Sequence, residues 1–385
     1  MQSIDTTYYK YLNRFFSYKR PHGSGAEADW IKLFILNELN GRGIKWHIDD
    51  ARNIHVDRRN ISNTTNPKPL KPSRTLFVAH TDTVHSNEGH QKVTIDDEQV
   101  MRVVATDPKY PSNCLGADDG AGVLVLLAMM LNGVSGYFIF TRGEERGGIG
   151  SSHIAMQQFD LLSEFDRAIA FDRKGTSSVI THQAYGRCCS DAFADSLCEA
   201  LSNDELMYAP DATGVYTDTA EFIDAIPECT NISVGYMNEH TTNESLDLKH
   251  LAALIRQCVA LDWEALPVVR DPLEDELRDK QMWWEGYKDD FGMGGVYGKD
   301  TYNDFNMLAY DVCVQAYRGH TDDFLWLVAE AVNPADPDEV YRDLWSAKIP
   351  DHVLLQCMKD LDHAEDDVQT MQALLNVYEY LGVMR

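Results

Sequence analysis

Short apolar runs recur along the first 270 residues, each bounded by polar or glycine-containing segments. A run of about four to eight mostly apolar residues, rich in β-branched and aromatic side chains, is typical of a strand buried on both faces. Such strands occupy the interior of a sheet. Four of them are predicted: TLFVAH (75–80), YFIFT (137–141), RAIAFD (167–172) and TNISVGY (230–236).

Longer segments with apolar positions at helical spacing lie between and around these runs. They predict helices over residues 26–43, 121–133, 190–202 and 246–266, and the first two end at glycine. Strands that alternate with helices indicate an α/β domain. We therefore expect a mixed, mainly parallel sheet flanked by helices on both faces.

A change of pattern in PVVRDPLEDE (267–276) predicts a domain boundary. Residues 1–266 are expected to form the α/β domain, and residues 267–385 an acidic, mainly helical C-terminal appendage. Residues 271–385 carry 25 acidic and 9 basic side chains, and solubility is the simplest explanation of this charge. Covering the mouth of a cleft and mediating assembly remain alternatives for this region.

The charge and the cysteines narrow the environment in which the protein is expected to act. A net charge of -27 and a pI of about 4.7 exclude nucleic acid and anionic membranes as partners. The 8 cysteines include no CxxC pair, which favours reduced thiols over a disulfide framework. Neither a signal peptide nor an apolar stretch long enough to span a membrane is visible. We therefore expect a cytoplasmic protein.

Imidazole and carboxylate groups follow each of the four predicted strands. In an open parallel sheet, ligands bind just beyond the carboxyl ends of the strands, so these groups are expected to share one site. A pair of aspartates also precedes the predicted helix 121–133. The residues are His80 and Asp82, Asp118 and Asp119, Glu144 and Glu145, Asp172, and His240.

Each of these residues alone has a structural explanation; for example, an aspartate before a helix often caps its first turn. Gathered over one sheet edge, however, these groups need a cation to offset their charge. Two imidazoles and at least three carboxylates suit two divalent ions, with zinc expected and manganese or cobalt as alternatives. Such a paired site needs one carboxylate that bridges the ions and another that stays free as a base.

Five sequence blocks resemble those of the co-catalytic zinc exopeptidases: HTDTV, LGADDGAG, TRGEERGGIGS, AFD and VGYMNEHTTNE. That clan includes peptidase T, glutamate carboxypeptidases, aminoacylases and bacterial leucyl aminopeptidases. The resemblance covers about residues 74–262, with the blocks in the same order, and it implies the zinc exopeptidase fold.

The resemblance also implies roles for individual residues. His80 and Asp172 would bind one metal ion, Glu145 and His240 the other, and Asp118 would bridge them. Glu144 would be the general base, and Asp82 would fix the ring of His80 from its far nitrogen. The peptide bond between Asp118 and Asp119 is expected to be cis.

The spacing of the blocks subdivides the clan. Enzymes similar to peptidase T insert a lid domain before the last ligand, but only 68 positions separate Asp172 from His240 here. The chain thus resembles the lidless aminopeptidases in architecture, although GADDGAG and GEERGGIGS are closer to peptidase T. In lidless enzymes a tyrosine contacts the oxyanion, and Tyr216 lies at the corresponding place. Asp218 would orient Tyr216 or a ligand, and a packed tyrosine is the alternative.

Four further residues have weaker claims to a role in the site. His85 is expected to be structural, with a contact to a metal ligand as the alternative. Glu244 would either cap the following helix or contact a ligand. His153 and His182 are expected to be ordinary core or surface histidines.

These features predict a dinuclear metallopeptidase that cleaves short peptides, as an aminopeptidase or a di- or tripeptidase. An N-acyl amino acid amidohydrolase or a carboxypeptidase is the alternative, because Arg142 and Arg173 flank the expected ligands and would suit a substrate carboxylate. A metal-binding scaffold without activity is a third hypothesis, although Glu144 and every ligand are present. The sequence decides neither the substrate preference nor the oligomeric state, and a homo-oligomer is one of the open alternatives.

Overall fold

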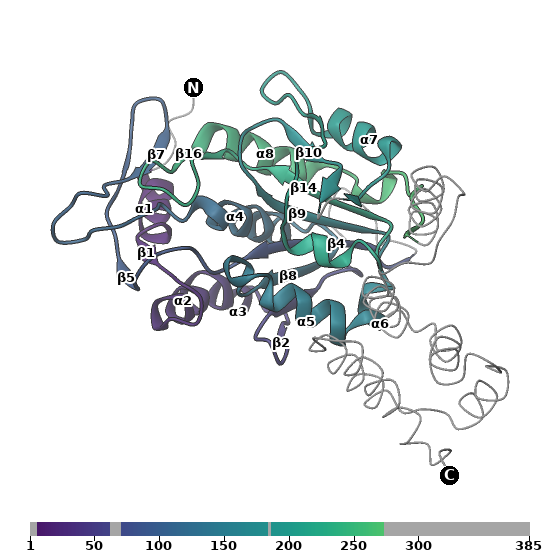
Figure 1. The fold of residues 1–385 in the computed structure, drawn as a ribbon, viewed down its shortest axis with the longest axis horizontal. Coiled ribbons are helices and arrows are strands. Elements are labelled where there is room, and N and C mark those ends of the chain that lie inside the picture. Colours follow the sequence, from purple (N-terminus) through teal and green to yellow (C-terminus); the bar gives the residue numbers. More distant parts are fainter. Residues whose placement is uncertain (1–5, 62–70, 184–185, 273–385) are drawn as a thin grey trace, which may run out of the picture. The chain divides into compact units, whose positions relative to one another are not determined.

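A computed structural model of the chain describes residues 6–61, 71–183 and 186–272. Their centre is an eight-stranded sheet with the order β13-β10-β14-β9-β4-β8-β3-β2 (Figure 1). The bounds are β2 His47–Ile48, β3 Ile54–Asp57, β4 Thr75–His80, β8 Tyr137–Thr141, β9 Arg167–Arg173, β10 Ser178–Ile180, β13 Ala209–Asp211 and β14 Glu228–Ser233.

The four strands predicted from apolar runs form the middle of this sheet. β14, β9, β4 and β8 are neighbours and run parallel, so their carboxyl ends meet at one edge. The strands β3 and β2 continue the sheet antiparallel on one side, and β10 joins β14 antiparallel on the other. The predicted fold class, a mixed and mainly parallel sheet, is confirmed for the described residues.

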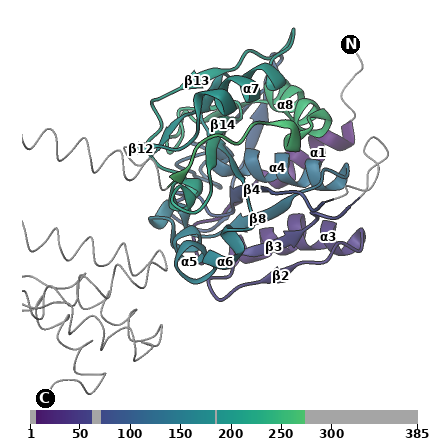
Figure 2. The same ribbon diagram turned by 90° about the vertical axis from the view of Figure 1, so that its right-hand side faces the viewer.

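Helices cover both faces of the sheet (Figures 1 and 2). Helices α4 (Ala117–Leu131) and α8 (Leu248–Ala260) pack together on one face, and α5 (Ile149–Gln157) lies on the other. Nearly all of α4 is buried, because it is apolar around its whole circumference. Other helical elements are α1 Thr6–Phe15, α2 Gly25–Trp30, η1 Ile31–Leu36, α3 Asn37–Gly41, η2 Glu144–Arg146, α6 Phe159–Leu162, α7 Asp191–Leu201, η3 Asp218–Phe222 and η4 Trp263–Ala265.

A second sheet of four strands, in the order β15-β16-β7-β6, lies beside the first. Its members are β6 Val93–Ile95, β7 Val100–Val103, β15 Tyr236–Met237 and β16 Ser245–Asp247. The loop between β15 and β16 carries His240, so this residue comes from outside the central sheet. Two-stranded ladders pair β1 (Tyr18–Lys19) with β5 (Gly89–His90) and β11 (His182–Gln183) with β12 (Gly186–Arg187).

Several predicted elements differ from the structure at their ends, and two of them have a clear physical cause. The predicted strand 230–236 stops at Ser233, since Gly235 has a φ of 100° and the chain then enters the second sheet. The predicted helix 246–266 begins at Leu248, because Asp247 accepts hydrogen bonds from the first-turn amides of Lys249 and His250. It ends at Ala260, and a separate short turn follows.

The expected helical appendage beyond residue 272 lies outside the described residues. Within the described part of the chain, none of the helices combines the length and apolar character needed to cross a bilayer.

Candidate metal centre

The candidate metal ligands converge at the edge where the four parallel strands end. His80 is the last residue of β4, Asp172 is near the end of β9, and Glu145 lies in the turn η2 that follows β8. Asp118 is at the start of α4, and His240 arrives from the β15–β16 loop. The pairing of β4 with β8 accounts for part of this convergence. His80 lies opposite Thr141, the last residue of β8, so it lies next to the loop that carries Glu144 and Glu145.

Asp118 occupies the centre of the cluster. Its Oδ1 lies 3.0 Å from Nε2 of His80, and its Oδ2 lies 3.1 Å from Nε2 of His240. The Nε2 of His240 is also 3.0 Å from Oε1 of Glu145, and the Nε2 of His80 is 3.6 Å from Oδ1 of Asp172. Two groups whose ligand atoms lie close enough to hold a metal ion share Asp118, namely His80–Asp118–Asp172 and Asp118–Glu145–His240. The cluster also includes the group His80–Glu144–Glu145.

The electrostatics of the cluster fit positively charged ligands. Burial raises the pKa of Glu144 to about 10, and burial together with the charge of Asp118 raises that of Asp172 to about 7. Hydrogen bonds to Asp118 and Glu145 raise the pKa of His240 to about 11. Without a metal, protons must therefore neutralise this buried negative charge. Divalent cations would replace these protons, so the residues fit a metal centre.

The backbone and neighbouring side chains hold Asp172 in place. The side chain of Asn231 accepts from the amide of Asp172 (2.7 Å) and donates to its carbonyl (2.8 Å). Thr217 donates to Oδ2 of the same carboxylate (2.7 Å), and Tyr236 donates to Oδ1 (3.1 Å). The orientation of Asp172 towards His80 is therefore fixed by three other elements.

Asp82 connects His80 to the loop that carries Glu144. Nδ1 of His80 lies 3.1 Å from the backbone carbonyl of Asp82 and 3.7 Å from its Oδ1. That Oδ1 accepts from the amides of Gly143 (2.7 Å) and Glu144 (3.3 Å). Oε2 of Glu144 is 4.0 Å from Nε2 of His80. The peptide bond between Asp118 and Asp119 is cis, as the resemblance implies.

Tyr216 lies farther along the same face and does not join either ligand group. Its hydroxyl donates to Oε1 of Glu221 (2.9 Å) and leaves no space for a side chain at Gly148. This contact accounts for one glycine of the GEERGGIGS block, which has a φ of 67°. Asp218 is buried in η3, where it accepts from Thr141 at the end of β8.

His85 belongs to a buried hydrogen-bonded network rather than to the ligand groups. Its Nε2 lies 3.0 Å from the side chain of Gln91, and its Nδ1 lies 2.6 Å from the hydroxyl of Thr83. Burial and the charge of Arg20 lower its pKa to about 3, so it is a neutral, structural side chain. This agrees with the structural interpretation of His85.

The sequence reasoning missed a buried ion pair that holds the ends of two ligand-bearing strands together. Both carboxylate oxygens of Glu27 accept from Arg142, and Oε1 also accepts from the hydroxyl of Thr81 (3.0 Å). Thr81 directly follows His80, and Arg142 precedes Glu144 by two positions. The one local sequence signal for this pair is a serine followed three positions later by a glutamate, which is typical of a helix start. Here Ser24 caps α2 and Glu27 is the glutamate.

Both arginines that were expected near a substrate carboxylate contact groups of this chain. Arg142 is occupied by Glu27, and Arg173 donates to Thr213 (2.9 Å) and lies 3.5 Å from Asp211. Glu27, His22 and Asp82 also lie close enough to hold a cation. The guanidinium of Arg142 already neutralises Glu27, however, so this group is a poorer metal site than the two that share Asp118.

Replacing Glu27 with alanine is expected to lower the free energy of unfolding by about 3–5 kcal/mol, because Arg142 would stay largely buried without its partner. Urea denaturation of the full chain measures this change. The matched control is Asp29→Ala, an exposed position on the same helix, with an expected change within about 0.5 kcal/mol. Equal stability of the two variants would refute a bracing role for the pair.

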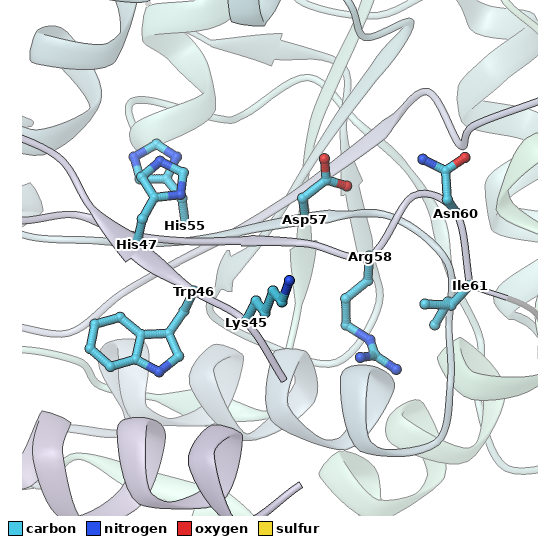
Figure 3. Close-up of a pocket in the computed structure, with 8 residues that line it drawn as sticks. All are labelled: Lys45, Trp46, His47, His55, Asp57, Arg58, Asn60 and Ile61. Carbon is cyan, nitrogen blue, oxygen red and sulfur yellow. The ribbon is translucent and has the colours of Figure 1, made fainter. Parts of the chain in front are cut away.

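A surface depression of about 390 Å³ lies elsewhere, along the edge strand β2 and its neighbour β3 (Figure 3). It shares no residue with the candidate ligand groups, and in Figure 3 the rings of His47 and His55 stack on each other. This depression is therefore separate from the candidate metal centre. The lining residues are Lys45, Trp46, His47, His55, Asp57, Arg58, Asn60 and Ile61.

Comparison with known proteins agrees with this description. Residues 60–256 match the model of Peptidase family M28. The fold is similar to aminopeptidase PepT from Bacillus cereus ATCC 10987 (14% identity, TM-score 0.53, covering 66% of this chain and 96% of that one). It is also similar to a tripeptidase from Staphylococcus aureus subsp. aureus Mu50 (15% identity, TM-score 0.51, 65% and 95%). A search of curated protein sequences finds no match.

Proposed function

The chain belongs to peptidase family M28 and is a metallopeptidase, and from this premise we propose that it releases N-terminal residues from short peptides. It would act as an aminopeptidase or as a di- or tripeptidase. The observation that carries the proposal is the position of Asp118, whose two carboxylate oxygens face different imidazoles, those of His80 and His240, at 3.0 and 3.1 Å.

Two zinc ions would be held by five side chains, with His80 and Asp172 on one, Glu145 and His240 on the other, and Asp118 between them. Zinc in such a pair supplies Lewis-acid polarisation of the scissile carbonyl and activation of a water molecule. Manganese and cobalt accept the same oxygen and nitrogen ligands. The distances within each group, 3.0–3.6 Å between nitrogen and oxygen atoms, support a common ion for each set.

Glu144 would carry the proton between the two halves of the reaction. One of its carboxylate oxygens would take a proton from the attacking water and return it to the nitrogen of the leaving amine as the C–N bond breaks. Burial alone favours the protonated form of Glu144, whereas bound divalent cations would favour the ionised carboxylate that can accept a proton from water. Asp82 would support this role through the amides of Gly143 and Glu144, which fix the backbone of the base. Tyr216 remains our candidate for contact with the developing oxyanion.

The partners of two arginines disfavour a substrate with a carboxylate beside the scissile bond. Arg142 and Arg173 are engaged by Glu27, Thr213 and Asp211. A substrate carboxylate would have to compete with these groups for either guanidinium, whereas a free amine needs neither arginine. This contrast disfavours the deacylase and carboxypeptidase alternatives.

We also propose that residues 1–266 form the catalytic domain and that the protein acts in the cytoplasm. All six cysteines in the described residues are unpaired and buried, which suits a reducing compartment.

The function is tested with a panel of di-, tri- and tetrapeptides that have free or acetylated N-termini. We expect release of the first residue only from free N-termini, loss of activity after treatment with a chelator, and recovery when zinc, manganese or cobalt is added. Release only from acetylated substrates would instead identify a deacylase. Full activity in the presence of chelator would refute a metal-dependent reaction.

A further inference from the structure

Glu244 places its carboxylate against the backbone that leads into α4. Its Oε2 accepts from the amides of Leu115 (2.7 Å) and Gly116 (3.1 Å). Its Oε1 accepts from the amides of Ala117 (2.6 Å) and Asp118 (3.1 Å). The side chain is 1% exposed, so one buried carboxylate satisfies four consecutive amides.

These amides need a partner from elsewhere in the chain. The first amides of a helix have no intrahelical acceptor, and a side chain at the N-cap usually supplies one. The N-cap of α4 is Gly116, which has a φ of 74° and carries no side chain. A Cβ at this position would also lie 3.0 Å from His85 and 3.1 Å from Arg20 and Thr83. Because residue 116 must be glycine, it cannot supply a side-chain acceptor, and the carboxylate of Glu244 accepts from these amides instead.

The acceptor comes from the loop that also carries a candidate ligand. Glu244 lies four positions after His240, between β15 and β16, and 126 positions from Asp118. The carboxylate therefore ties the His240 loop to the backbone of Asp118. The side chains of these two residues approach to 3.1 Å at the centre of the cluster. Asp247, not Glu244, caps the following helix, and Glu244 contacts the candidate ligand Asp118 through its backbone amide.

We propose that Glu244 is a positioning residue for the metal centre. Its carboxylate fixes residues 115–118, and with them the direction in which Asp118 presents one oxygen to His80 and the other to His240. The inference rests on the proposed function only in that Asp118 would bridge two metal ions. A helix cap without this role would stabilise the fold but would not affect metal affinity in particular.

The chain offers a matched control for a buried, amide-binding glutamate. Glu228 is 0% exposed and accepts from the amides of Ser190 (2.7 Å), Val269 (2.8 Å) and Arg270 (3.1 Å). It is the first residue of β14 and so lies at the end of the sheet opposite the metal centre. Glu228→Gln therefore disturbs a similar buried network away from the candidate ligands.

The experiment titrates zinc into metal-free full-length protein, in competition with a chromogenic chelator, for wild type, Glu244→Gln and Glu228→Gln. The glutamine keeps the shape but loses charge and turns a donor towards amides that are themselves donors. Glu244→Gln is expected to weaken zinc binding by about 10- to 100-fold, as is typical when a group that orients metal ligands is lost. Glu228→Gln is expected to bind zinc as wild type does.

Folding is checked by circular dichroism before each titration. If Glu244→Gln does not fold, Glu244→Asp replaces it, since aspartate keeps the charge but is too short to reach all four amides. Wild-type zinc affinity in a folded Glu244 variant would overturn the inference, as would equal weakening in Glu228→Gln. If wild type binds zinc but releases no residue from any peptide, the proposed function fails and the positioning role stands.

Discussion

Replacing Glu144 with glutamine is expected to lower kcat by about 10²- to 10⁴-fold, because the amide cannot accept a proton from water. The side chain is 12% exposed and lies close to both His80 and Glu145, but in the proposed assignment it is the base and not a ligand of the two groups that share Asp118. Metal content should therefore stay at the wild-type value. Steady-state hydrolysis of a preferred peptide, with elemental analysis of the same sample, measures both quantities.

The control for this variant is Glu199→Gln, an exposed glutamate of α7 that contacts no residue of the cluster. It should show wild-type kcat and metal content. If Glu144→Gln retains kcat within about twofold, another group is the base. If it loses metal instead, Glu144 is a ligand and its role has been assigned incorrectly.

Replacing Asp118 with alanine is expected to have the largest effect on metal binding. The carboxylate belongs to both ligand groups, so its loss removes one ligand from each at once. Zinc affinity should fall by at least about 100-fold, the upper end of the cost of losing a group that only orients a ligand. Hydrolysis should fall below detection, since the base would have no activated water to deprotonate.

Two further variants, Asp172→Ala and Asp97→Ala, are the controls for Asp118→Ala. Asp172 belongs to only one of the two groups, so its variant should weaken one of two binding events. Asp97 is exposed in the turn between β6 and β7, and its replacement should leave both intact. Identical metal titrations for Asp118→Ala and Asp97→Ala would contradict the central position assigned to Asp118.

The interior of the fold was predictable because the four central strands are buried on both faces. Segments such as TLFVAH and YFIFT are almost uniformly apolar, and their pattern leaves little choice of structure. The outer strands β10 and β13 were harder to predict. Each has three residues, and pairing with partners far along the chain decides their conformation.

The convergence of the candidate ligands was predictable from topology, since strands that run parallel bring their following residues to one edge. His80, Glu145 and Asp172 are placed in this way. The contacts that hold the site together were not predictable, because their partners lie far apart in the sequence. Glu27 reaches Arg142 across 115 positions, and Glu244 reaches Asp118 across 126.

Arg142 illustrates the limit of reading charge from sequence alone. An arginine beside two glutamates after a strand suits a substrate carboxylate, and the sequence offered no partner for it. The structure supplies Glu27 from a helix near the N-terminus, outside the residues that match the family model. The partner of Arg142 thus comes from a segment that the five sequence blocks do not include.

The central claim is that the two ligand groups that share Asp118 hold two metal ions. The most direct test is the binding stoichiometry of the full chain, measured by equilibrium dialysis of metal-free protein against zinc and elemental analysis. We predict that zinc binding saturates at two ions per chain and that both are lost together in Asp118→Ala. Saturation at one ion, or two ions that survive the loss of Asp118, would contradict a shared bridging carboxylate.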